Sequence, residues 1–191
     1  MPRSVTTSRV LAEATITPTD IPSADGDMVT VAVTVPTRGL IHRASLLWGK
    51  SSAFAFNNTS GGMYVHTACA AGAGAGTTRL VSADAQSIIA AGAMNPKNGQ
   101  YSGGDLAIGS SIYAWVHSID LNPNVKGTSD SDDEGSVATG GGPVGVFYDV
   151  SGTTLGPSAG TGTLFFTWIA GADLNDDALF CKLRLEIEPV S

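Results

Sequence analysis

The chain has 191 residues, of which 42% are hydrophobic, and this is enough to bury the core of one independent domain. Only 14% of the residues are charged, where about 25% is ordinary, and 24 are glycine. A net charge of −7 without a cluster of Lys and Arg argues against a nucleic-acid partner. No apolar stretch is long enough for a membrane-spanning helix, so we expect no membrane partner.

The N-terminal sequence contains no apolar segment of the kind found in signal peptides. We therefore expect synthesis in a cytoplasm without export. In that compartment Cys69 and Cys181 should remain reduced, although they could pair in a particle that leaves the cell. Residues 1–9, which include Arg3 and Arg9, are interpreted as an N-terminal arm.

Period-two alternation of apolar residues, typical of strands with one buried face, is the clearest pattern in the chain. The two segments that show it most clearly are Met28–Val35 and Leu179–Ile187, and both are predicted to be strands. The other strands that we expect, in chain order, are Val10–Ile16, Ile41–Trp48, Gly62–Thr67, Thr77–Val81, Ser111–Ile119, Val144–Val150 and Thr163–Ala170. Short strands separated by Gly, Pro, Asn and Asp predict an all-β, antiparallel β-sandwich over residues 10–191. We expect it to be jelly-roll-like, although the pattern does not separate this strand order from an immunoglobulin-like one.

Three segments between the strands have a different composition. Ser82–Gly92 begins with N-cap residue types and ends on glycine, which favours one short helix or, alternatively, a buried loop. Ala70–Gly76 contains only small residues and suits a flexible loop or a tight edge. The longest loop, at about residues 120–142, is acidic, and loops of this length are usually functional or mobile.

The expected strand Thr163–Ala170 carries large apolar residues on both faces, with Phe165 and Ile169 on one of them. It is either a central strand covered on both sides or a strand with one face against another subunit. The candidate interface residues, taken from the opposite face and from the N-terminal arm, are Leu164, Phe166, Trp168, Arg3 and Arg9.

Two motifs resemble catalytic sequences but lack essential parts. Gly156–Gly160 matches the G-x-S-x-G pattern of hydrolases, yet a strand rather than a helix follows Ser158, and all three histidines precede it. Gly49-Lys50-Ser51 resembles the end of a phosphate-binding loop, but bulky residues replace the glycine loop before it. We therefore predict that the chain is not an enzyme.

Oxygen-bearing residues alternate in the acidic loop, as they do in calcium-binding loops. The glutamate that completes an EF-hand is missing, and such spacing is more typical of Asx turns. A calcium site of another kind remains the alternative, and its candidate ligands are Asp130, Asp132, Asp133 and Glu134. No other cofactor is expected.

Histidine and tryptophan residues fall on expected strands. His42, His66 and His117 lack metal-binding spacing and are interpreted as ordinary strand residues. The three tryptophans, which are Trp48, Trp115 and Trp168, suit core packing or, alternatively, a sugar-stacking platform in a carbohydrate-binding module.

The alternating strands, the low charge with abundant Gly, Ala and Thr, and the long polar loop resemble those of bacteriophage virion structural proteins, in particular small proteins that decorate or cement capsids. The resemblance is one of style over the whole chain, and no motif carries a site residue across. It implies a homo-oligomer, located in the virion, that binds the major capsid protein or other virion proteins and bridges coat subunits. A phage tail or head-fibre component is the alternative.

Overall fold

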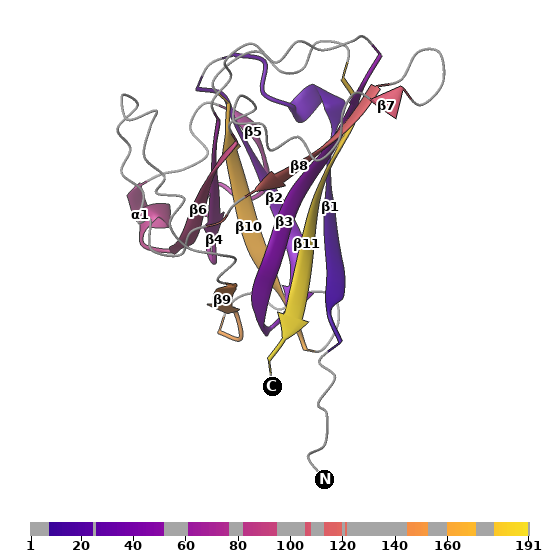
Figure 1. The fold of residues 1–191 in the computed structure, drawn as a ribbon. Coiled ribbons are helices and arrows are strands. Elements are labelled where there is room, and N and C mark those ends of the chain that lie inside the picture. The colour runs from indigo at the N-terminus through magenta and orange to yellow at the C-terminus, as the bar shows by residue number, and fades with distance from the viewer. Residues whose placement is uncertain are drawn as a thin grey trace.

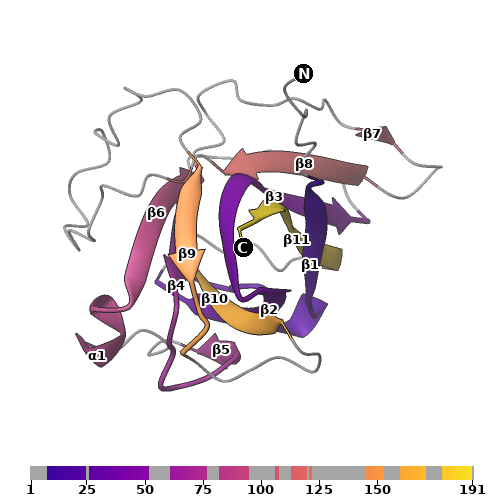
Figure 2. The same cartoon turned by 90° about the horizontal axis from the view of Figure 1, so that it is seen from below.

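The computed structural model shows two antiparallel β-sheets, here called sheet A and sheet B, that face each other across a hydrophobic core (Figure 1, Figure 2). Their side chains on the facing sides interlock, as in other β-sandwiches. The residues that the structure describes are 8–24, 26–51, 61–76, 82–94, 106–107, 113–119, 121, 145–152, 160–170 and 178–190.

Sheet A contains the first and the last strand. Its order is β1 (Val10–Ile16), β11 (Ala178–Pro189), β3 (Arg38–Lys50), β8 (Tyr113–Ile119) and β7 (Leu106–Ala107), while β9 (Val146–Asp149) pairs with the beginning of β3. Sheet B has the order β5 (Gly74–Gly76), β2 (Met28–Pro36), β10 (Thr161–Ile169), β4 (Gly61–His66) and β6 (Ile88–Met94). A short 3-10 helix, Pro18–Asp20, lies between β1 and β2.

Strands from the beginning of the chain pair with strands from its end. β1 pairs with β11, β2 with β10, β3 with β8 and β9, and β4 with β6. This nested pairing, divided over two sheets, is the strand order of a jelly roll. The expected all-β antiparallel sandwich is therefore confirmed, and the strand order is the jelly-roll alternative.

Eight of the nine expected strands coincide with observed strands, and the ninth, Thr77–Val81, lies outside the described residues. The helix expected over Ser82–Gly92 is wrong beyond its first turn. A helix, α1, covers only Ser82–Ala85, and β6 begins at Ile88. Pairing along β4 favours the strand because β-branched Ile88 and Ile89 suit a sheet better than a short isolated helix.

The core lies between the sheets and is built by alternate residues of the strands. The four valines of β2, from Val29 to Val35, all point into it, as do Leu183, Leu185 and Ile187 of β11. Cys181 lies among them as a free thiol, and burial raises its pKa to about 12, so it stays protonated and unreactive. The alternation seen in the sequence thus correctly predicts which face of β2 and β11 is buried.

Tyr148 of β9 places a hydroxyl group in the core without a hydrogen-bond partner among the described residues. Its ring lies over Gly39, where an added Cβ would stand 2.7 Å from the Tyr148 hydroxyl oxygen. The side chain therefore fits only against a glycine.

We expect Tyr148→Phe to raise the free energy of unfolding by about 1 kcal/mol, because a buried hydroxyl without a partner carries a desolvation cost that phenylalanine avoids. Urea unfolding checks this, with Gly39→Ala as a control that should destabilise the same contact. A loss of stability in Tyr148→Phe would contradict the expectation.

Candidate functional site

The interface residues predicted on β10 lie inside the molecule. Leu164 and Phe166 are 0% exposed and Trp168 is 1% exposed, and all three belong to the core. The prediction that they contact another subunit is therefore wrong. The physical reason is that both faces of β10 are apolar, and the sandwich buries the face that carries the larger number of bulky side chains. Phe165 and Ile169 lie on the outer face, where they are half-buried.

The burial of Trp168 also removes it from any sugar-stacking platform. Trp48 and Trp115 are register partners on β3 and β8 of sheet A, whereas Trp168 belongs to sheet B. The three tryptophans therefore do not form one common exposed platform.

Other predicted site residues lie where the structure gives no description. Arg3 and the proposed calcium ligands Asp130, Asp132, Asp133 and Glu134 are outside the described residues. Within the described ranges, no group of three or more His, Cys, Asp or Glu residues could hold a metal ion. No helix in those ranges has the length and apolar character needed to cross a membrane.

The phosphate-loop resemblance at Gly49–Ser51 falls on a strand. Gly49 and Lys50 continue β3 and pair with both β11 and β8. Their backbone groups therefore belong to a sheet and form no glycine loop around a phosphate. The ring of Phe180 lies across Gly49, where an added Cβ would meet it at 2.3 Å, so this glycine serves cross-strand packing.

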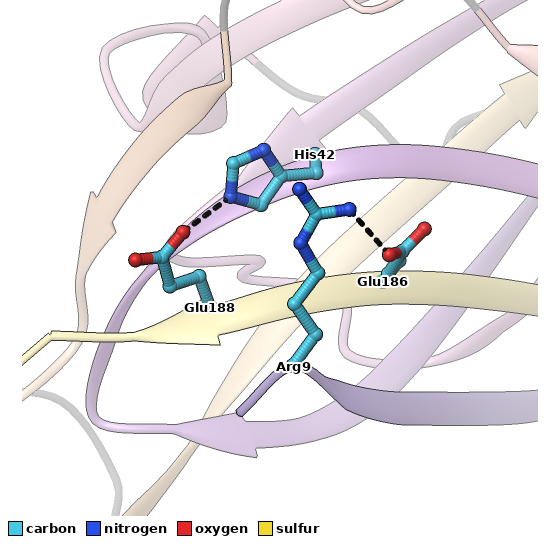
Figure 3. A network of polar contacts seen from close by, with 4 residues as sticks. All are labelled: Arg9, His42, Glu186 and Glu188. Atoms are coloured by element: carbon cyan, nitrogen blue, oxygen red, sulfur yellow. Dashed lines mark hydrogen bonds and ion pairs between the residues drawn. The ribbon is translucent and has the colours of Figure 1, made fainter. Parts of the chain in front are cut away.

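The outer face of sheet A carries ion pairs between neighbouring strands. Arg9 Nη1 lies 2.6 Å from Glu186 Oε1, and His42 Nε2 lies 2.8 Å from Glu188 Oε2 (Figure 3). The Arg9 side chain extends from the start of β1 across β11, between Glu186 and the His42–Glu188 pair (Figure 3). Arg9, a predicted interface residue, is thus about half exposed and held against its own sheet.

Glu13 of β1 joins two basic residues of β11. Its Oε1 accepts a hydrogen bond of 2.7 Å from Arg184 Nε, and its Oε2 lies 3.5 Å from Lys182 Nζ. The hydrogen bond from Arg184 holds the pKa of Glu13 below its usual value, and the hydrogen bond from Arg9 does the same for Glu186. These carboxylates therefore remain ionised at neutral pH, but as exposed pairs they add little to stability.

The outer face of sheet B has the opposite character. Its described residues on β2, β10 and β4 are uncharged, since they are Met28, Thr30, Ala32, Thr34, Thr163, Phe165, Thr167, Ile169, Gly62, Tyr64 and the neutral His66. Met28, Tyr64, Phe165 and Ile169 are each partly exposed, whereas Thr30, Thr167 and His66 on the same face are buried. The two outer faces of the sandwich thus differ sharply in charge.

A chain of hydrogen bonds between buried side chains of this face crosses three strands. His66 Nδ1 lies 2.8 Å from the carbonyl oxygen of Ala68, and His66 Nε2 lies 2.8 Å from Thr167 Oγ1. Thr167 Oγ1 in turn lies 2.8 Å from Thr30 Oγ1. Because a carbonyl only accepts, Nδ1–H donates to Ala68. With a neutral imidazole Nε2 is an acceptor, so Thr167 donates to Nε2 and Thr30 donates to Thr167. A protonated imidazole would reverse both of these hydroxyl hydrogen bonds.

The surroundings of His66 keep the imidazole neutral. Burial lowers its pKa below the usual value, and this outweighs the raising effects of the Ala68 carbonyl and the Asp84 carboxylate. The side chain is 0% exposed, and the ring of Phe165 stacks on it with centroids 5.8 Å apart. Asp84 itself is buried and accepts a hydrogen bond of 2.8 Å from the Ala70 N–H.

We expect the free energy of unfolding to fall as the pH drops below about 6.5, because unfolding then lets His66 take up a proton that its folded site disfavours. The stability that depends on neutral His66 is fully present above that pH, and it is lost as the pH falls toward the lowered pKa of His66 in the folded state. Urea titrations between pH 8 and pH 5 measure it. His66→Gln, which cannot titrate, should have a flatter profile, and identical profiles for the two proteins would contradict the expectation.

The sequence placed His66 correctly on a strand but gave no sign of this buried chain. Regular alternation along β4 places His66 on the outer face, after buried Val65, but its hydrogen-bond partner Thr167 belongs to another strand, so no signal within β4 reveals the chain. The arrangement holds strands together and presents no pair of groups for acid–base chemistry in an open cleft.

Comparisons with known proteins give no match: no family model, no curated protein and no solved structure is similar to this chain.

Proposed function

We propose that the chain is a non-enzymatic structural protein of a virus particle, which decorates or cements the capsid by bridging neighbouring coat subunits. The observation that carries the proposal is the uncharged outer face of sheet B, on which Met28, Tyr64, Phe165 and Ile169 are partly exposed. The central parts of protein–protein interfaces are poor in charge and enriched in aromatic residues and methionine. We assign this face to contact with the major capsid protein.

The strand order gives general support to this proposal. Jelly rolls recur in viral capsid proteins and in lectins. The same fold carries unrelated functions, so the assignment depends on the surface rather than on the fold. A phage tail or head-fibre component would use the same kind of surface, and the position of the protein in the particle distinguishes these roles.

Two measurements test the proposal. Mass spectrometry of purified particles should find the chain in stoichiometric amount relative to a coat or tail protein, and its absence from particles would refute the virion role. Labelling the particles with an antibody and imaging them should place the chain on the capsid rather than on the tail or a fibre.

Phe165→Lys should lower the amount of the protein in purified particles at least tenfold, because the lysine would bury a cation against the coat protein. Phe147→Lys is the matched control, since Phe147 is an exposed phenylalanine of sheet A, and it should be retained. Thermal unfolding of both variants must first show that they are folded. Equal retention of both would exclude sheet B as the contact face.

A further inference from the structure

β1 is the outermost strand on one side of sheet A (Figure 1), and among the described residues no strand pairs with its outer edge. Natural proteins usually protect such an edge with a proline, a bulge or an exposed lysine. β1 has no proline, and its pairing with β11 runs without a shift from Val10 to Ile16. Its one charged residue, Glu13, is turned back over the sheet toward Arg184. The edge therefore lacks the usual protection.

The side chains at this edge form a symmetric pattern. Leu11 is 65% exposed, more than any other exposed large hydrophobic residue in the described ranges. Arg9 lies two positions before it and Glu13 two positions after it, so all three belong to the outer face of sheet A. The order of basic, apolar and acidic residues complements itself when a second copy runs in the opposite direction.

We propose that β1 pairs antiparallel with β1 of a second copy of this chain, around a two-fold axis at Leu11, so that sheet A continues through a dimer. In this register Leu11 faces Leu11 of the second copy. Arg9 faces Glu13 of the second copy, and the symmetry repeats this contact on the other side of the axis. Strand addition of this kind supplies main-chain hydrogen bonds, and the side chains set the register.

The backbone and the existing ion pairs accommodate this arrangement. With the axis at Leu11, odd-numbered residues pair with odd-numbered residues and even-numbered residues with even-numbered ones. The N–H and C=O groups of β1 that point away from β11 therefore face the outward-pointing N–H and C=O groups of the second copy. Glu13 Oε1 is occupied by Arg184, but Oε2 is held only by Lys182 at 3.5 Å. A carboxylate accepts about four hydrogen bonds, so Glu13 can also accept from Arg9 of the second copy. For this contact the Arg9 side chain, which bonds to Glu186 in the single chain, turns from β11 toward the edge.

Neighbouring registers are less favourable. An axis at Glu13 sets two carboxylates opposite each other, and an axis at Arg9 does the same with two guanidinium groups. An axis at Ala12 places Leu11 opposite a carboxylate. Only the axis at Leu11 combines an apolar pair with opposite charges on both sides.

The mass of the purified protein in solution tests the dimer. Light scattering at micromolar concentration should give twice the chain mass of 19.4 kDa. Leu11→Asp should weaken the dimer at least a hundredfold, because two carboxylates would then meet on the axis. Thr15→Asp is the matched control on the same exposed face, outside the paired segment, and should leave the dimer intact. A monomer at all concentrations, or a dimer insensitive to Leu11→Asp, would overturn the proposal.

Cysteine cross-linking tests the register. Directly opposed side chains have Cβ atoms about 4.5–5.5 Å apart, close enough for a disulfide after small adjustments. With copper phenanthroline as the oxidant, Leu11→Cys should form a covalent dimer, whereas Thr15→Cys and the unmodified chain should not. Cross-linking of Glu13→Cys in place of Leu11→Cys would refute this register. The dimer does not depend on the virion role, so either proposal can fail without the other.

Discussion

Phe166→Ala is expected to lower the free energy of unfolding by about 3–5 kcal/mol, the usual effect of removing a fully buried aromatic ring. Phe166 is 0% exposed in the core of the sandwich. Since a domain of this size is commonly stable by only about 5–15 kcal/mol, the variant should be close to unfolding at room temperature. Urea denaturation followed by tryptophan fluorescence measures the change.

The neighbouring phenylalanine provides the control for this prediction. Phe165 is on the same strand but on the outer face, where it is half-buried. Phe165→Ala should cost only about 1–2 kcal/mol, because less surface is lost and no closed cavity forms. Equal losses in the two variants would mean that the two faces of β10 are equally buried, contrary to the structure.

Thr167→Val is expected to lower the free energy of unfolding by about 2–3 kcal/mol although the two side chains have nearly the same shape. The hydroxyl of Thr167 donates to His66 Nε2 and accepts from Thr30, and all three residues are buried. Valine would leave both partners without a hydrogen bond inside the protein. The measurement is again urea denaturation, at pH 8 so that His66 remains neutral.

Two further variants separate the hydrogen bonds from the packing. Thr163→Val changes a half-buried threonine on the same face of the same strand and should alter stability by less than about 0.5 kcal/mol. Thr30→Val combined with Thr167→Val should cost less than the sum of the two single changes, because the two hydroxyl groups bond to each other. Additive losses would show that the threonines act independently.

The two proposals use different parts of the surface. The uncharged outer face of sheet B is assigned to a capsid partner, and the edge of sheet A at β1 is assigned to a second copy. A two-fold dimer carries two copies of the sheet B face, so a single dimer could contact two coat subunits at once. Such bivalent contact strengthens attachment without any additional interface in the monomer.

The sequence alone predicted the strands well where one face is apolar and the other is polar. β2 and β11 are examples, because an alternating strand can be buried on only one side and a shift by one residue would expose its whole apolar face. The interpretation of the bulky residues before Gly49 as a strand was also correct, since they belong to β3.

Only the tertiary structure decided the points on which the local pattern is ambiguous. Both faces of β10 are apolar, and its pairing between β2 and β4 determined that Phe166 turns inward and Phe165 outward. The segment from Ile88 combines β-branched isoleucines with alanines that also suit a helix, and pairing with β4 makes it a strand. His66, Thr167 and Thr30 are far apart in the chain and meet only because three strands lie side by side. Such contacts depend on register between distant segments, which period-two patterns within one strand do not contain.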